Sequence, residues 1–168
     1  NRFAFTPRTA METTREQTAY EQERGKPMPS RNHGFVQAMI LGAVLPPYFS
    51  DYTPYSELTL ELAGRRVTPD VCVYPKQSFS FQDDIAAMTE MPLLAVEILS
   101  PTQGVQEVVT QIQNLLEAGV ESCWLVQPAT ETVTIYRSGE KPRTFSTGPF
   151  TDPATGIEAD IADIFPDE

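Results

Sequence analysis

The sequence is poor in cysteine and histidine and has no long apolar run. Its 168 residues include two cysteines, Cys72 and Cys123, and one histidine, His33. Both cysteines lie in apolar, strand-like runs, so we predict buried, reduced thiols and no disulfide framework. No stretch reaches the roughly 18 consecutive apolar residues of a membrane span, and no charged start precedes an apolar core as in a signal peptide. These absences predict a soluble, cytoplasmic protein.

Basic residues are also scarce. Lysine and arginine together number 12, against 23 aspartates and glutamates, which gives a formal net charge of −11. A surface of this charge repels nucleic acid unless a basic patch or bound cations reverse the field locally. The sequence has no recognisable basic recognition helix or aromatic stacking platform. Tight non-specific DNA binding is therefore not expected.

Length and composition predict one globular domain. A chain of 168 residues, of which 40% are apolar, can bury a continuous core around a small sheet and its covering helices. We expect residues 1–10 to be a tag remnant or a disordered extension, and residues 11–168 to form the domain. A second full domain is not expected.

Three helices are predicted from caps, stops and apolar spacing. A polar helix is expected over residues 13–24, where good helix formers run up to a glycine. A second, largely buried helix is expected to begin at a cap, Ser30 or Asn32, and to end at Pro46. In residues 105–116 the apolar side chains recur at helical spacing and form one stripe.

Strands are predicted on both sides of this third helix. Before it, we expect a hairpin of residues 58–62 and 67–74, a loop at 76–92 with a short helical piece at 84–88, and a buried strand at 93–99. After it, we expect two strands joined by a turn at residues 129–130, and then an edge strand. This order predicts an α/β sandwich with a central mixed sheet flanked by helices.

Two acidic residues stand inside strands that are otherwise apolar. Glu97 lies at the centre of LLAVEILSPT, and Asp70 follows Pro69 at the start of the run VCV. A buried, unpaired charge is so costly that such a group normally neutralises or acquires a partner. If the two strands are neighbours and both side chains share one face, the carboxylates can converge on one divalent cation, whose charge offsets their repulsion.

The ligands available to such a cation are oxygens. Two acids, one backbone carbonyl and several waters suit Mg²⁺ or Mn²⁺. Such a metal could polarise a phosphoryl oxygen and generate a nucleophile from water, which is the chemistry of phosphodiester hydrolysis. The residues also allow an alternative, in which Asp70 caps a turn and Glu97 pairs with an arginine such as Arg65 or Arg66.

Several segments in combination resemble one known family. They are VTPDVCVYP, LLAVEILSPT, EAGVESCWLVQP and TVTIYRSG, within residues 20–140. This combination resembles the Uma-two family of restriction endonucleases, in the PD-(D/E)XK nuclease superfamily. The resemblance implies a restriction-endonuclease-like sandwich and a metal-dependent endonuclease that acts on DNA, with a homodimer as the expected assembly.

The resemblance also implies roles for particular residues. Asp70 and Glu97 match the metal-binding acids, and the backbone carbonyl of Ile98 is implied as a third ligand. The superfamily's lysine would fall at Leu99, and the lysine that this family carries on the following helix corresponds to Gln111. A neutral glutamine can only hydrogen-bond where a lysine would orient water or stabilise transition-state charge, so we expect catalysis to be weakened or lost.

Other residues have a functional and a structural interpretation. His33 matches a histidine often found in the family, and it either lines the site or is bonded to backbone at a helix start. Glu21 or Glu23 either supplies an additional acid to the metal or lies on a solvated helix face. Lys76 is the nearest lysine in sequence to the Asp70 strand, and its proposal as a substitute lysine rests on that proximity alone.

Three classes of function follow. The first is a metal-dependent endonuclease. The second is a catalytically degenerate nuclease-fold domain that binds nucleic acid or protein, which Gln111 and the net charge of −11 favour. The third is an oligomerising structural module, since edge strands and an apolar helix offer surfaces for a twofold interface.

Overall fold

The computed structural model describes residues 18–24, 26–78 and 80–167. The expected extension at residues 1–10 and the beginning of the expected first helix lie outside the described residues. What is described of that helix is α1 (Ala19–Arg24). None of the helices within the described ranges has the length and apolar character needed to cross a membrane.

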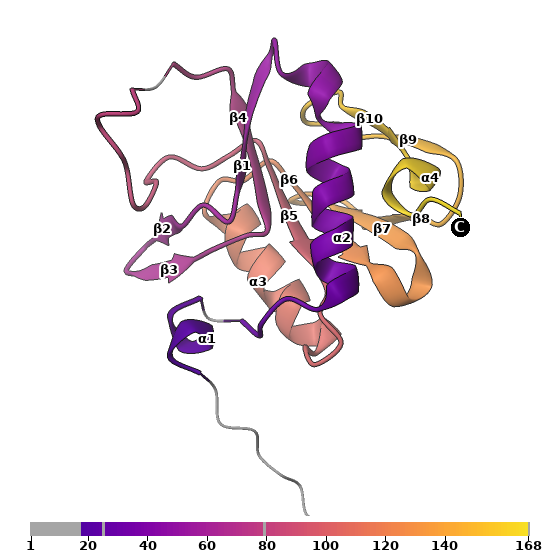
Figure 1. Ribbon diagram of the computed structural model, residues 1–168, viewed down its shortest axis with the longest axis horizontal. Coiled ribbons are helices and arrows are strands. Elements are labelled where there is room, and N and C mark those ends of the chain that lie inside the picture. Colours follow the sequence, from indigo (N-terminus) through magenta and orange to yellow (C-terminus); the bar gives the residue numbers. More distant parts are fainter. Residues whose placement is uncertain (1–17, 25, 79, 168) are drawn as a thin grey trace, which may run out of the picture.

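A mixed sheet forms the centre of the described part of the chain (Figure 1). Its strands, in spatial order, are β1 (Tyr52–Ser56), β4 (Val71–Pro75), β5 (Leu94–Ile98), β6 (Ser122–Gln127), β7 (Thr132–Tyr136) and β8 (Arg143–Phe145). Strands β5 and β6 are parallel, whereas the other neighbouring pairs are antiparallel. Helix α3 (Val105–Glu117) connects the parallel pair, because parallel strands require a crossover. The predicted mixed sheet between helices is confirmed.

Helices pack on both faces of the sheet because successive strand residues point to opposite sides. One face buries Val71, Val73, Leu94, Val96 and Ile98 in a cluster with Val36, Ile40 and Ile164. The other face buries Cys72, Tyr74, Ala95, Cys123 and Leu125 in a cluster with Val108, Ile112 and Leu115 of α3. The predicted apolar stripe of α3 is therefore the side of that helix that packs on the sheet.

Helix α2 (Arg31–Met39) is capped by Ser30, which is one of the two caps predicted from the sequence. The Ser30 hydroxyl accepts a hydrogen bond from the backbone N–H of His33 at 3.2 Å. The helix continues through a π-helical segment (Ile40–Val44) into a 3₁₀ turn (Pro46–Tyr48). This cap places His33 in the first turn of α2.

The predicted hairpin is present, but its second strand is divided. Strands β2 (Leu60–Leu62) and β3 (Arg65–Val67) pair with each other in a separate two-stranded sheet. The chain leaves strand geometry at residues 68–70 and resumes as β4, which pairs with β1 and β5. Pro69 has no N–H to donate to a ladder, which is the physical reason for a break at this point.

Other elements differ from the sequence prediction. The prediction of a short helix at residues 84–88 is wrong, because this segment contains bends and an isolated bridge between Met88 and Leu60. Strand β1, the hairpin of β9 (Pro149–Thr151) and β10 (Glu158–Asp160), and helix α4 (Ile161–Ile164) were not predicted. These elements are short and lack a clear apolar period. The cysteines are buried free thiols, as expected.

Candidate active site

Asp70 and Glu97 lie close together where β4 begins and β5 ends. The antiparallel ladder of β4 and β5 ends with the pair Val71 and Val96; Asp70 directly precedes Val71, and Glu97 directly follows Val96. The backbone N–H of Asp70 donates to the carbonyl of Val96 at 3.0 Å, which holds Asp70 beside β5. Both carboxylates contact one group, Nζ of Lys26, at 2.6 Å from Asp70 and 3.5 Å from Glu97. The structure therefore brings together the two acids singled out in the sequence.

The Asp70 carboxylate is fully buried and accepts hydrogen bonds on both oxygens. Oδ2 accepts from the backbone N–H of Ile98 at 2.7 Å and lies 3.1 Å from Nε2 of His33. Oδ1 accepts from Nζ of Lys26 at 2.6 Å. Burial raises the pKa of this carboxyl, but the His33 hydrogen bond and the charge of Lys26 outweigh burial and hold the pKa below its ordinary value.

The Glu97 carboxylate is also buried and has fewer close donors. Its Oε1 accepts a hydrogen bond from Nε2 of Gln111 on α3 at 2.7 Å, and its Oε2 lies 3.5 Å from Nζ of Lys26. Burial raises the pKa of Glu97 to about 7. The charge of Lys26 lowers this pKa in part, whereas the negative charge of Asp70 raises it further. The surroundings therefore shift the two acids in opposite directions, because they lower the pKa of Asp70 and raise that of Glu97.

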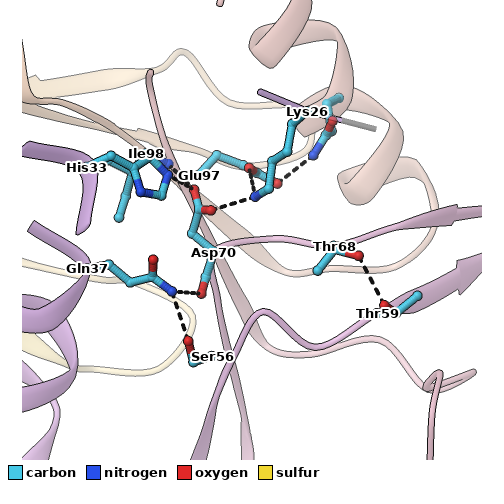
Figure 2. Close-up of polar contacts among 10 residues, drawn as sticks. Lys26, His33, Gln37, Ser56, Thr59, Thr68, Asp70, Glu97 and Ile98 are labelled. Atoms are coloured by element: carbon cyan, nitrogen blue, oxygen red, sulfur yellow. Dashed lines mark hydrogen bonds and ion pairs between the residues drawn. The ribbon is translucent and has the colours of Figure 1, made fainter. Parts of the chain in front are cut away.

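Lys26 occupies the space between the two carboxylates (Figure 2). Its side chain is 5% exposed, and it comes from the segment that joins α1 to α2. The two ion pairs join this segment to Glu97 of β5 and to Asp70, which directly precedes β4. Sequence analysis did not identify this lysine. The available signal was the demand of two buried acids for a cation, but nothing in the segment RGKPMPS shows that its lysine points inwards.

Glu21 fixes the segment that carries Lys26. It is 4% exposed, and its carboxylate accepts hydrogen bonds from the backbone N–H of Thr18 at 2.8 Å and of Met28 at 3.1 Å. The expectation of a solvated helix face is therefore wrong for Glu21. The described contacts give it a structural role in the turn after α1. The side chain of Glu23 lies outside the described part of the structure, so its predicted role stays untested.

Two side chains of α2 hold Asp70 against that helix. Because a carboxylate only accepts hydrogen bonds, Nε2 of His33 is the donor to Asp70. The other ring nitrogen, Nδ1, is buried and has no hydrogen-bond partner within the described residues. Gln37, one turn further along α2, donates through Nε2 to the backbone carbonyl of Asp70 at 3.0 Å and to Oγ of Ser56 at 2.9 Å (Figure 2). A place in the site was one of the two interpretations of His33 drawn from the sequence, whereas Gln37 was not singled out.

The alternative partners considered from the sequence lie elsewhere. Arg65 is an exposed residue of β3, and Arg66 of the same strand lies 3.8 Å from the carboxylate of Glu61. Lys76 follows the far end of β4, and six residues at about 3.3 Å each put it about 20 Å along the strand from Asp70. Its Nζ donates to the backbone carbonyl of Phe49 at 2.6 Å. Lys76 therefore does not reach the two acids.

The position that carries the superfamily's lysine is apolar here. Leu99 packs beside the cluster on the α3 face, and its N–H donates to the carbonyl of Val126 at 2.9 Å. Gln111, at the position of the family's helix lysine, does reach the site through its bond to Glu97. The charge that a lysine would bring from β5 or α3 is thus absent at both positions, and the ammonium in the site comes from Lys26.

The donor set fits a hard divalent cation with few protein ligands. Asp70 and Glu97 both direct an oxygen at one point, which Nζ of Lys26 marks. Mg²⁺ is commonly held by one or two carboxylates, with waters and substrate phosphates completing its coordination. No cluster of three or more His, Cys, Asp or Glu suited to a metal occurs among the described residues. A site of this kind would therefore depend on the two acids and on water, and the backbone carbonyl of Ile98 stays a predicted ligand.

The fold and the pair of acids define a protein of the restriction-endonuclease-like class. The family model Uma2, described as "Putative restriction endonuclease", matches residues 11–162, and the chain belongs to this family. A crystal structure from Anabaena variabilis ATCC 29413, described as a "putative nuclease belonging to DUF820", is 26% identical in sequence. It superposes with a TM-score of 0.67 over 83% of each chain. A comparison with curated proteins found no match.

Proposed function

We propose that this protein is a metal-dependent endonuclease that hydrolyses phosphodiester bonds of DNA. Asp70 and Glu97 would hold Mg²⁺ or Mn²⁺, with the backbone carbonyl of Ile98 as a third ligand. The family and the nuclease-like fold support the class of reaction. The observation that carries the proposal is the contact of one cationic group, Nζ of Lys26, with Oδ1 of Asp70 and Oε2 of Glu97.

The residues around the acids have positioning roles in this proposal. When bound, a divalent cation supplies Lewis acidity towards a phosphoryl oxygen and lowers the pKa of a coordinated water. His33 and the N–H of Ile98 fix the orientation of Asp70, while Gln111 fixes that of Glu97. Gln111 brings no positive charge to the transition state, so we propose slower catalysis than a lysine at this position would give.

A second candidate is a catalytically degenerate nuclease-fold domain that binds nucleic acid or protein. Two observations favour it. Gln111 is neutral, and the ammonium of Lys26 already lies between the two carboxylates. The net charge of −11 makes a protein partner the more favourable of the two for this candidate. The homodimer expected from the resemblance and a cytoplasmic location stay predictions under either candidate.

Cleavage of supercoiled and single-stranded DNA tests the endonuclease proposal. The unmodified chain is expected to nick DNA with Mg²⁺ or Mn²⁺ and to stop when EDTA is added. Asp70→Asn and Glu97→Gln, which keep side-chain size, should each lower the rate about a hundredfold or more. The exposed Glu61→Gln is the matched control and should cleave normally. Cleavage that survives both site substitutions would come from a contaminant or another site, and the absence of any cleavage favours the degenerate domain.

A further inference from the structure

We infer that Lys26 is the resident cation of this site, and that its ammonium and a divalent metal exclude one another between Asp70 and Glu97. The inference rests on the proposed function, because it takes these two carboxylates as the metal ligands. It adds a residue from outside the sheet and α3, and a competition that sets when the site can bind metal.

Each carboxylate directs one oxygen at Lys26 and the other oxygen at different donors of the protein. Asp70 presents Oδ2 to the N–H of Ile98 and to His33, and it presents Oδ1 to Nζ at 2.6 Å. Glu97 presents Oε1 to Gln111 and Oε2 towards Nζ at 3.5 Å. A Mg²⁺ ion bound to both acids would lie about 2.0–2.1 Å from each ligand oxygen. The oxygens that such an ion needs are therefore those that Lys26 contacts.

Because the site is buried, the ammonium of Lys26 and a divalent ion cannot occupy it at the same time. The side chains of Lys26, Asp70 and Glu97 are 5%, 1% and 3% exposed, so little solvent separates the charges. At low dielectric two cations a few ångströms apart repel strongly. A divalent ion can therefore enter only when Nζ leaves the carboxylates. The departure of Lys26 also frees the two carboxylate oxygens that it contacts for water and substrate.

The position of Lys26 is built into the fold. Pro27 follows it and restricts the backbone, and Ser30 then caps α2. Glu21 ties α1 to the same segment through its bond with the N–H of Met28. An exposed lysine would gain little from pairing with acids, whereas Lys26 gives up solvent to reach two buried ones. This arrangement keeps the metal-free site folded and electrostatically compensated.

Chemical modification of the unmodified chain tests the displacement directly. The sequence has three lysines, Lys26, Lys76 and Lys141, so acetylation of each can be followed by peptide mass spectrometry. Without metal, Lys26 should react far more slowly than the two exposed lysines. Saturating Mn²⁺ should raise the acetylation of Lys26 severalfold and leave the other two rates unchanged. Protection of Lys26 that persists when Mn²⁺ is bound would overturn the inference.

Metal affinity of variants gives a second, independent measurement. Mn²⁺ binding is measured by titration calorimetry on three variants. Lys26→Met removes the charge, Lys26→Arg keeps it, and Lys141→Met is the exposed control. Removal of the competing ammonium should tighten Mn²⁺ binding in Lys26→Met about tenfold or more. Lys26→Arg and Lys141→Met should not bind more tightly than the unmodified chain. Equal affinity in Lys26→Met, or no Mn²⁺ binding by any variant, would overturn the inference.

The outcomes separate this inference from the proposed function. If Lys26→Met binds Mn²⁺ more tightly but neither it nor the unmodified chain cleaves DNA, the competition stands and the endonuclease proposal fails. If the unmodified chain cleaves DNA with Mg²⁺ while Lys26 stays protected from acetylation, the endonuclease proposal stands and the competition fails. Should Lys26→Met not fold, the acetylation experiment still decides.

Discussion

Replacement of Glu97 by glutamine should remove part of the pH dependence of stability. Burial raises the pKa of Glu97 from 4.5 to about 7 in the folded protein. Between these pH values the folded state holds a proton that the unfolded state has released. Stability due to this group is therefore highest below pH 4.5 and falls as the pH rises through 7.

The size of the effect follows from the two pKa values. A change from 4.5 to about 7 corresponds to about 3 kcal/mol, at 1.36 kcal/mol for each pKa unit. This is the cost of ionising Glu97 in a site where Lys26 offsets only part of the effects of burial and of Asp70. Glutamine resembles the protonated acid in shape and does not ionise. The stability of Glu97→Gln relative to the unmodified chain should therefore rise by about 3 kcal/mol from pH 4.5 to pH 8.

Urea unfolding at several pH values measures this difference in the absence of metal. The single tryptophan, Trp124, is fully buried, so its fluorescence reports loss of the core. Glu61→Gln, an exposed residue on β2, is the control and should show no such trend. Parallel pH curves for Glu97→Gln and the unmodified chain would refute the reasoning, because Glu97 would then titrate alike in the folded and unfolded states.

Two further substitutions test a structural acid and the missing helix charge. Asp152 is fully buried and accepts hydrogen bonds from side-chain and backbone donors. Asp152→Ala should therefore lower the free energy of unfolding in urea by about 3 kcal/mol or more, with the exposed Asp51→Ala as control. A loss below about 1 kcal/mol would contradict this. Gln111→Lys should raise metal-dependent DNA cleavage about tenfold or more, because it adds charge beside Glu97, and an unchanged or lower rate in a folded variant would contradict this.

The long elements of the fold could be predicted because their patterns are strong. The apolar stripe of residues 105–116 predicted α3, and the continuous apolar runs predicted β5 and β6. Three-residue strands such as β9 and β10 contain too few positions to show a period, so tertiary pairing decides them. Strand β1 was missed because proline lies at its centre, which only an edge strand tolerates.

The candidate site could be predicted in part for a similar reason. Asp70 and Glu97 were conspicuous because they interrupt apolar runs, and strand pairing then placed them together. Lys26 could not be found in this way, since a lysine between a glycine and a proline is ordinary in a surface turn. Its inward direction becomes visible only in its contacts with Asp70 and Glu97, which are distant along the chain.

The break before β4 explains how a buried acid comes to be directed at a cation. Pro69 ends the preceding segment, so the regular ladder of β4 with β5 begins only at Val71. The N–H of Ile98, two residues past the last pair of β5 with β4, then takes the carboxylate of Asp70 as its acceptor. This bond fixes one oxygen of Asp70 at the strand end and turns the other towards Lys26. The site is therefore a consequence of where the ladder ends, and in the competition that we propose, the cation that occupies it decides whether the arrangement is closed or open to substrate.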